Sequence, residues 1–395
     1  MNKILNYISD KFVFWNLEQI SHGYLNLVDV HGKEYSFGDN KSFLKAKLKI
    51  NNPSFCFNIL RRGSSGLGES YMNGEFETED LTSLIELSAK NIKITYKFSG
   101  FFQFSLLHIF LKRNIFSNTK ERSKKNISLH YDLGNEFFST WLDKTLTYSC
   151  GIFNSSKETL EKAQINKYNK LIDLIQPKTG DKILEIGCGW GGFAEHLAKN
   201  YDVKLDCITI SKKQFLFTKA RINNARLNHK VNVKMLDYRD VSKKYDSIFS
   251  IEMIEAVGEK YLNHYFKTIK ENLVPGGRGA IQAIVIKDEL HDRYKTKEDF
   301  IQKYIFPGGF LPSIQSLNKY SNKSGLKIEK YHSYGSHYSS TLNKWRESFL
   351  NSWDDISRQG FNSSFKKMWN FYFAYCDAGF KSKNIDLVQF SLCNK

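Results

Sequence analysis

The stretch KILEIGCGWGG, residues 182–192, decides the fold of this chain. It is an apolar run ending in glycines, followed by the helical pattern FAEHLAKN, and this order predicts a buried strand, a tight turn and a helix. Gly187, Gly189, Gly191 and Gly192 would let the backbone approach a ligand closely, and the helix N-terminus would offer free N–H groups. The stretch therefore predicts a ligand-binding strand–turn–helix unit.

Four further apolar, β-branched runs follow: VKLDCITI (203–210), VNVKML (231–236), YDSIFSIE (245–252) and GAIQAIVI (279–286). Helical patterns separate them, which predicts an α/β domain with a parallel sheet and helices on both faces. DLVQFSL (386–392) is expected to add an edge strand. The segment 287–322 interrupts the alternation, and we expect it to form a helical insertion over the carboxyl ends of the strands, above the active site.

The region before residue 112 has a different pattern, typical of a smaller α+β domain. YLNLVDV (24–30), KLKI (47–50) and FCFNIL (55–60) are predicted as strands. In DLTSLIELSAK, Asp80 is expected to cap a helix with leucines and Ile85 on one side. Six basic residues and one Glu between Lys112 and Lys125 predict a basic interdomain linker over 112–126. The predicted domains are therefore 1–111, for lipid engagement or interaction, and 127–395, for catalysis.

The overall composition limits the class of protein and the kinds of partner that the chain can have. With 395 residues, 41% of them hydrophobic, the chain can build sizeable cores, which excludes disorder. The net charge of +17 predicts a polyanionic partner, either nucleic acid or an anionic lipid surface. The run FFQFSLLHIFL (101–111) is too short to span a membrane and predicts either an interfacial helix or an ordinary buried one. Six cysteines show no zinc spacing and no signal-peptide pattern is visible, so no metal and a reducing cytoplasm are expected.

Two cofactor classes compete for the glycine turn. Gly187, Gly189 and Gly192 satisfy the dinucleotide pattern GxGxxG, and Asp206 lies near the expected distance, but in the middle of a strand. Glu185, two residues before the first glycine, completes E-x-G-x-G-x-G, a form that suits an adenosyl sulfonium without a pyrophosphate. The residues alone thus favour S-adenosylmethionine over NAD.

Six strings in order carry a resemblance to a known family: HYDLGNEFFSTWLDKTLTYSCGIF (130–153), LEIGCGWGGF, ITISKKQ, IEAVG, YIFPGG and LPS. They resemble the cyclopropane fatty acid synthases and related fatty-acyl methyltransferases. The resemblance is close over 120–395 and weaker before it, through GLGESYMNGEFETEDLTSLIEL (66–87).

The resemblance implies an S-adenosylmethionine-dependent methyltransferase with a Rossmann-like domain. Such an enzyme adds a methylene group to the cis double bond of an unsaturated phospholipid acyl chain and forms a cyclopropane ring. The carbocation on the way is deprotonated by a bound bicarbonate, and aromatic rings stabilise it. A homodimer in the cytoplasm, peripherally associated with the inner face of an anionic membrane, is also implied, with no nucleic acid as partner.

The resemblance assigns roles to individual positions. The residues implied to bind the cofactor are Tyr148, Ser149, Glu185, Gly187, Cys188, Gly189, Trp190, Gly191, Thr209, Ile210, Gln214, Asp237, Tyr238 and Ile251. Those implied to hold bicarbonate are Cys150, Glu255, the backbone of Ile284, and Tyr338. The walls of the acyl tunnel would be Tyr131 and Phe306, and the catalytic candidates are Glu255, Cys150, Tyr338, Gln282, Glu252 and Cys376.

Plainer readings exist for some of these residues. Cys150 can be a small packing residue, and Tyr131 and Phe306 are as typical of a core as of a tunnel. Cys376 matches a cysteine in many relatives, but no base stands beside it in the sequence. Glu255 differs, because a carboxylate just past a buried strand needs a partner there, which favours function.

The chain departs from the family pattern at two positions. Many members read HTI where this chain has QAI (282–284), and Gln282 can hydrogen-bond but cannot carry charge. Many also have Gly where this chain has Glu252, three residues before Glu255. If a helix starts here, both carboxylates face the same way, which would raise one pKa and could supply a protein base. These forms resemble a subgroup in which some members instead methylate the chain, leaving a methylene or methyl branch.

Two other function classes remain open. An RNA or DNA methyltransferase would need a basic groove with stacking aromatics beside the cofactor. The aromatics here lie in apolar strings such as YIFPGGFLP, which suit an acyl tunnel better. A lipid-binding protein without activity is disfavoured by the glycine turn and Glu255.

Overall fold

The computed structural model describes residues 3–94, 118–131 and 133–394, which form two compact units. Unit 1 contains residues 3–94, 296–305 and 360–384, and unit 2 contains the remainder. The chain therefore leaves unit 2 twice to contribute helices to unit 1. This differs from the predicted division at 111 and 127, which assumed that each domain is one continuous stretch.

Unit 1 is built on a four-stranded sheet in the order β2-β1-β3-β4, in which β1 pairs antiparallel with β2 and parallel with β3. The strands are β1 (Tyr24–Val28), β2 (Glu34–Gly38), β3 (Lys45–Ile50) and β4 (Phe76–Glu77). The helices are α1 (Lys3–Leu17), α2 (Phe55–Met72), α3 (Leu81–Lys90), α13 (Phe300–Tyr304) and α17 (Ser363–Lys381).

One helix prediction in unit 1 is confirmed and one strand prediction is wrong. Asp80 caps α3 by accepting hydrogen bonds from the backbone N–H groups of Thr82 and Ser83. FCFNIL, however, begins the helix α2 instead of forming a strand. The buried residues of this run are Phe55, Cys56 and Leu60, and the spacing of four residues between Cys56 and Leu60 is that of a helix face. A short apolar run does not by itself distinguish a strand from a helix.

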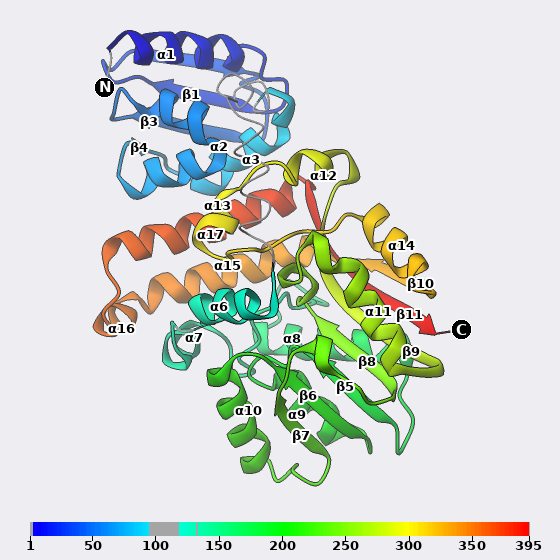
Figure 1. The fold of residues 1–395 in the computed structure, drawn as a ribbon. Coiled ribbons are helices and arrows are strands. Elements are labelled where there is room, and N and C mark those ends of the chain that lie inside the picture. Colours follow the sequence, from blue (N-terminus) through cyan, green and yellow to red (C-terminus); the bar gives the residue numbers. More distant parts are fainter. Residues whose placement is uncertain (1–2, 95–117, 132, 395) are drawn as a thin grey trace. The chain divides into compact units, whose positions relative to one another are not determined.

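Unit 2 contains a seven-stranded sheet in the order β10-β11-β9-β8-β5-β6-β7 (Figure 1). The parallel strands are β5 (Lys182–Ile186), β6 (Lys204–Thr209), β7 (Val231–Met235), β8 (Tyr245–Ile251) and β9 (Leu273–Ile286). The five predicted strands are thus confirmed. β10 (Leu326–Ser333) pairs antiparallel with β11 (Ile385–Asn394), and β11 pairs antiparallel with β9.

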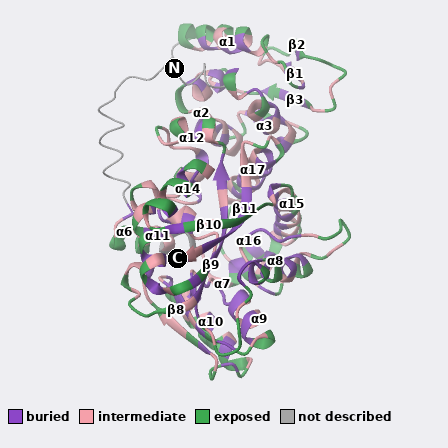
Figure 2. Ribbon diagram, turned by 90° about the vertical axis from the view of Figure 1, so that its right-hand side faces the viewer, coloured by how far each residue is buried: buried purple, intermediate pink, exposed green. Residues whose placement is uncertain are grey.

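The position of β11 corrects the predicted edge strand. It lies between β9 and β10, so it is paired on both sides. Its residues from Leu387 to Leu392 are buried without alternation, as expected for a strand covered on both faces, and Figure 2 shows β9 and β11 among the buried segments. The polar residues of this run, Gln389 and Ser391, therefore lie inside the protein.

Helices cover both faces of this sheet, which confirms a Rossmann-like α/β fold. On one face Leu184 and Ile186 of β5 join a core with Tyr265 and Phe266, and on the other face Ile183 joins a separate core. The helices of unit 2 are α6 (Lys120–Tyr131), α7 (Asn135–Trp141), α8 (Leu160–Ile175), α9 (Gly192–Asn200), α10 (Lys212–Asn224), α11 (Leu262–Asn272), α12 (Asp288–Tyr294), α14 (Ile314–Lys323), α15 (Gly335–Asn351) and α16 (Trp353–Arg358). Three short 3₁₀ turns are η1 (Tyr238–Asp240), η2 (Ile254–Ala256) and η3 (Glu259–Tyr261).

The second part of the predicted basic linker, from residue 118, packs against unit 2. Residues 112–117, like the apolar run 101–111, lie outside the described residues. From residue 118 onward the chain packs into unit 2: the Asn118 side chain donates to the backbone oxygens of Ala256 (3.0 Å) and Gly308 (2.9 Å), and Lys120 forms an ion pair with Asp240. Along the ranges that the structure describes, none of the helices is long and apolar enough to cross a membrane.

Candidate active site

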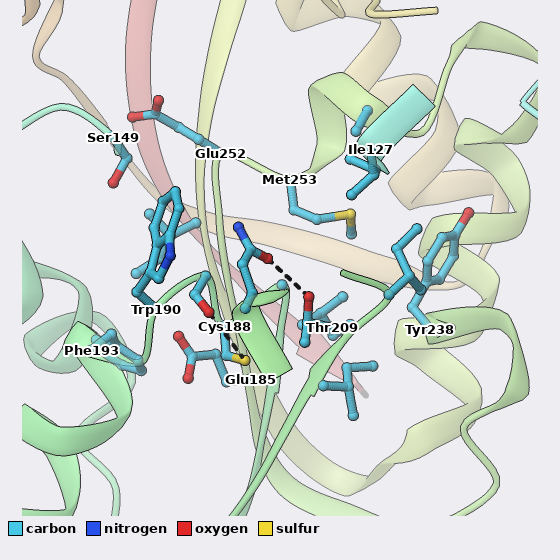
Figure 3. Close-up of a pocket in the computed structure, with 18 of the residues that line it drawn as sticks. Ile127, Ser149, Glu185, Cys188, Trp190, Phe193, Thr209, Tyr238, Glu252 and Met253 are labelled. Carbon is cyan, nitrogen blue, oxygen red and sulfur yellow. Dashed lines mark hydrogen bonds between the residues drawn. The ribbon is translucent and has the colours of Figure 1, made fainter. Parts of the chain in front are cut away.

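The glycine turn after β5 forms the floor of a pocket in unit 2 (Figure 3). Gly187 and Gly189 have positive φ angles of 83° and 52°, a backbone region that favours glycine. A Cβ on Gly189 would meet no atom within 4 Å, so this glycine faces open space where a ligand can approach the backbone. Gly191 serves the fold instead: it caps α9, and a Cβ there would lie 2.7 Å from Thr218.

The pocket lies where β5, β6 and β8 end, as expected for a ligand in such a sheet. The residues predicted to bind the cofactor that line it are Tyr148, Ser149, Glu185, Gly187, Cys188, Gly189, Trp190, Thr209, Ile210, Gln214, Asp237, Tyr238 and Ile251. Ser149 and Trp190 lie toward one end of the pocket and Tyr238 toward the other (Figure 3). The structure thus brings into one cavity residues that are spread over a hundred positions of sequence.

The end of the pocket near Tyr238 carries polar groups that suit an adenosyl moiety. Thr209 donates to the side-chain oxygen of Gln214 at 2.9 Å. Asp237 is held by two hydrogen bonds from Arg239, of 2.8 and 2.7 Å, so that its pKa stays below the usual range although burial alone would raise it. Arg239 lines the pocket and was missed in the sequence, where an arginine two residues after an aspartate carries no distinctive signal.

Glu185, at the end of β5, is a buried carboxyl group at the pocket floor. Burial raises its pKa to about 7, and the Cys207 thiol donates a hydrogen bond to its Oε2 at 3.4 Å. At neutral pH this group can therefore serve as either donor or acceptor toward a bound ligand.

Glu252 brings a second carboxyl group to the pocket, at the end near Ser149 (Figure 3). Its Oε1 accepts hydrogen bonds from the Cys150 backbone N–H (2.9 Å) and from the Gln282 amide (2.7 Å). Its Oε2 accepts one from the Tyr338 hydroxyl at 2.6 Å. Burial raises the pKa of Glu252, whereas these donors and the nearby Lys167 favour the ionised form.

The backbone of Glu252 is in the left-handed region, with φ of 47°. A non-glycine residue there costs about 1–3 kcal/mol, so the surrounding contacts must hold it in place. The carboxylates of Glu252 and Glu255 were expected to share a helix face, but Glu252 lies outside the short η2 turn that holds Glu255. Both groups still reach the same region, by a different backbone path.

Glu255 is the second member of this acidic pair. Its Oε1 accepts a 2.6 Å hydrogen bond from the Ile284 backbone N–H, while its Oε2 is buried and has no hydrogen-bond partner among the described residues. Burial and the charge of Glu252 raise its pKa to about 8. Glu255 is therefore mainly protonated at neutral pH.

The orientation of the Gln282 amide is set from the neighbouring strand. Gln389, opposite Gln282 in the β9–β11 register, donates to the Gln282 oxygen at 2.8 Å. The Gln282 NH₂ group is thereby directed toward Glu252. Gln389 was missed in the sequence, because its run was interpreted as an edge strand.

Lys167 of α8 adds the only buried lysine ammonium among the described residues. It donates to the Ser149 hydroxyl at 2.6 Å, and burial lowers its pKa to about 8 while the charge of Glu252 opposes this. In the sequence it resembles any other lysine of an amphipathic helix, and nothing there marks it as buried.

Aromatic side chains pack around Tyr148, which lines the same end of the pocket. The Tyr148 ring lies 5.1 Å from the ring of Trp345 and 6.2 Å from that of Phe306, measured between centroids. Tyr338 makes an edge contact with Trp345 at 6.1 Å. A positive charge that develops here would face electron-rich rings as well as the acidic pair.

Three predicted residues stand apart from this arrangement. The Cys150 thiol is fully buried with its pKa raised, so it contributes through its backbone N–H, as described above, and not as a nucleophile. Cys376 belongs to α17 of unit 1, where burial and the charges of Asp299 and Asp377 raise its pKa, the reverse of activation. Tyr131 ends α6, and its side chain is outside the described part of the chain.

Comparisons with known proteins agree on one family. The family model described as mycolic acid cyclopropane synthetase matches residues 118–390. The chain is 35% identical to the tuberculostearic acid methyltransferase UfaA1 of Mycobacterium tuberculosis, over 85% of this chain and 80% of that protein. It is 34% identical to the cyclopropane-fatty-acyl-phospholipid synthase of Escherichia coli, over 87% of each. Among solved structures, the mycolic acid cyclopropane synthase CmaA1 complexed with SAH and CTAB is similar, with a TM-score of 0.64 and 26% identity, over 68% of this chain and 98% of that one.

Proposed function

The chain belongs to the mycolic acid cyclopropane synthetase family of S-adenosylmethionine-dependent methyltransferases, and from this premise we propose that it modifies the cis double bond of an unsaturated phospholipid acyl chain, forming a cyclopropane ring. The observation that carries the proposal is the Glu252 carboxylate at one end of the glycine-turn pocket, with Glu255 and aromatic rings beside it. Closing the ring requires a carbocation to be stabilised and then deprotonated, and these groups supply both functions.

Different residues of the pocket bind the methyl donor, orient it and exclude water. Bound S-adenosylmethionine supplies an electrophilic methyl group. The glycine turn, with Asp237 and Gln214, binds and orients the donor, and Gly189 leaves the space that it needs. Tyr148, Tyr338 and Trp345 surround the reacting end and exclude water. Because an unactivated alkene is a poor nucleophile, holding the donor and the double bond in line contributes strongly to the rate.

The groups that the resemblance assigns to bicarbonate do not fit a further anion. The hydroxyl of Tyr338 and the backbone N–H of Cys150 both donate to Glu252, and the N–H of Ile284 donates to Glu255. A bicarbonate would have to compete with these two carboxyl groups for the same donors and would be repelled by an ionised Glu252. We therefore derive no step through bicarbonate.

A fatty-acyl C-methyltransferase that leaves a methylene or methyl branch is the second candidate. The relative named tuberculostearic acid methyltransferase is as similar to this chain as the relative named cyclopropane synthase. Both reactions share the methyl transfer. A methylene branch forms when a hydride first shifts from the methylated carbon to the neighbouring cation and the base then removes a proton from the methyl group, and a methyl branch requires a later reduction of that methylene group by a separate reductant.

The lipid partner accounts for features outside the pocket. Phe306, beside Tyr148, and Tyr131 are proposed walls of an acyl tunnel. The surplus of +17 and an exposed face of α1 support reversible docking on the inner, cytoplasmic face of an anionic membrane. On that face Ile4, Tyr7, Ile8 and Trp15 have exposed fractions of 66%, 64%, 48% and 58%. A homodimer, as in the resembled family, is part of the same proposal.

Product analysis tests the function. The protein is incubated with S-adenosylmethionine and vesicles of a monounsaturated phospholipid, and the fatty esters are analysed by mass spectrometry and proton NMR. Upfield ring protons are expected from a cyclopropane. Vinylidene signals would establish the second candidate, and methyl transfer to RNA but not to vesicles would overturn both.

A further inference from the structure

Glu252 occupies a backbone conformation that glycine adopts more easily. With φ of 47° it is one of five non-glycine residues of the described chain with a positive φ. Its N–H nevertheless donates to the Gln282 backbone oxygen at 2.8 Å, continuing the pairing of β8 with β9. The strained residue is therefore fixed by the sheet, and its side chain projects into the pocket. Strain held at such a position is typical of a functional group.

Three donors converge on the Glu252 carboxylate from three separate segments. They are the Cys150 N–H from the loop after α7, the Gln282 amide from β9, and the Tyr338 hydroxyl from α15. Three hydrogen-bond donors that converge on one point form a binding site for an anion. In this protein the carboxylate of Glu252 occupies that site. Gln389 fixes the direction of one of them.

The charges around Glu252 suit a proton acceptor. The charge of Lys167 lowers the pKa of Glu252 and so opposes the effect of burial. Glu255, the acidic neighbour of Glu252, is mainly protonated at neutral pH. Near Glu252, the Cys150 thiol is buried with its pKa raised, and the buried Tyr338 hydroxyl donates to the Glu252 carboxylate. The three donors and the Lys167 ammonium thus favour the ionised form of the carboxylate that lines the pocket.

We propose that the Glu252 carboxylate takes the place of a bound bicarbonate and is the base of this enzyme. This rests on the proposed function, since it names the group that removes the proton from the carbocation. The donors that the resemblance assigns to bicarbonate, the Cys150 N–H and the Tyr338 hydroxyl, hold the side chain of Glu252, whose backbone has the left-handed conformation that favours glycine. The enzyme therefore carries its base covalently and has no need of dissolved bicarbonate.

The step balances within the site. The alkene electron pair forms a bond to the donor methyl carbon while the carbon–sulfur bond breaks, and its electrons remain on sulfur as a neutral thioether. The neighbouring alkene carbon becomes a cation. Glu252 accepts a proton from the new methyl group, and the electron pair of that C–H bond closes the ring. Glu252 then stands as a carboxylic acid and releases its proton to solvent before the next turnover.

The test compares bicarbonate dependence in three forms of the full-length protein. Wild type, Glu252→Gln and Glu252→Gly are assayed with S-adenosylmethionine and dioleoyl phosphatidylglycerol vesicles, in buffer freed of carbon dioxide and then with bicarbonate added. Wild type is expected to be equally active in both. E252Q, which keeps the shape but not the base, is expected to lose about 10²–10⁴-fold in rate in both. E252G, which relieves the strain and vacates the anion position, is expected to regain activity when bicarbonate is added.

Controls separate this inference from the proposed function. Circular dichroism and donor binding by calorimetry verify that each variant is folded and binds S-adenosylmethionine, and Glu271→Gln, an exposed glutamate of α11, is the matched control. A wild type that requires bicarbonate, an active E252Q, or a folded, donor-binding E252G that bicarbonate does not rescue would each overturn the role of Glu252. Lipid left unmodified by wild type in both buffers would instead overturn the proposed function.

Discussion

Gln389 and Gln282 face each other across β11 and β9, and the amide of Gln389 donates to the Gln282 oxygen at 2.8 Å. This pair connects the antiparallel strand of the sheet to the acidic pair, because the NH₂ group of Gln282 then points at Glu252. A strand that seems remote from the glycine turn thus positions a group at the reacting end of the pocket.

Replacing Gln389 with leucine should therefore change catalysis as well as stability. The unsatisfied Gln282 oxygen would cost about 1–3 kcal/mol, and a freely rotating amide would hold Glu252 less well. We expect a lower kcat, unchanged donor affinity, and an acid limb of the pH–rate profile moved to higher pH, since Glu252 loses a donor to its charged form. Asn272→Leu, which removes a buried amide in α11, controls for stability alone. If Q389L lost stability with its pH profile unmoved, the positioning role would be excluded.

The raised pKa of Glu255 predicts how stability varies with pH. In the folded protein the pKa is about 8 against an ordinary value of 4.5, so the folded state binds more protons between these values. The free energy of unfolding should therefore fall as pH rises from about 4.5 to 8, by at most about 1.4 kcal/mol per pH unit from this group. Urea unfolding of wild type and Glu255→Gln from pH 5 to 9 isolates the effect as the difference between the two curves. Parallel curves would show that Glu255 does not titrate in this way.

Gly189 and Gly180 form a matched pair that tests the pocket. Both have positive φ, 52° and 86°, and at both a Cβ would meet no atom within 4 Å, but Gly189 alone lines the pocket. Alanine at either position should cost about 1 kcal/mol of stability through backbone strain. G189A should in addition bind S-adenosylmethionine about tenfold or more weakly, as one methyl group intrudes on the ligand. Calorimetry with the two variants checks this, and equal affinities would place the donor elsewhere.

The exposed face of α1 predicts membrane binding that depends on charge and on apolar contact. Ile8→Ser with Trp15→Ser should weaken co-sedimentation with phosphatidylglycerol vesicles, and added salt should weaken the binding of wild type. Leu216→Ser in α10, where the leucine is 55% exposed, is the control for a lost apolar surface residue. Binding that ignored both the double substitution and ionic strength would remove α1 and the charge from the membrane role.

The parts of the fold that were predictable depend on local pattern. The glycine turn, the five parallel strands and the Asp80 cap follow from periodicity and from residues whose conformational preferences are strong. The position of β11 between β9 and β10 was not accessible, because strand order depends on long-range pairing. The same limit hid the helices α13 and α17, which the chain contributes to unit 1 from distant positions.

Within the site, residue identities were easier to predict than contacts. Spacing alone brought Glu252 and Glu255 together, but on a helix face that does not exist, since Glu252 is left-handed. Lys167 and Gln389 were missed because a buried polar group looks in the sequence like an exposed one until its partners are known. Cys376, which was a predicted catalytic candidate, belongs to unit 1.

Transfer of a labelled methyl group tests the central claim most directly. Wild type is incubated with S-adenosylmethionine carrying a trideuterated methyl group and with monounsaturated phospholipid vesicles, and the acyl chains are analysed by mass spectrometry and NMR. Because Glu252 is expected to remove one hydron from the transferred carbon, the account predicts a cyclopropane whose new ring carbon retains two deuterons. An acyl chain that retained all three deuterons, or one that gained no carbon while the donor was consumed, would contradict it.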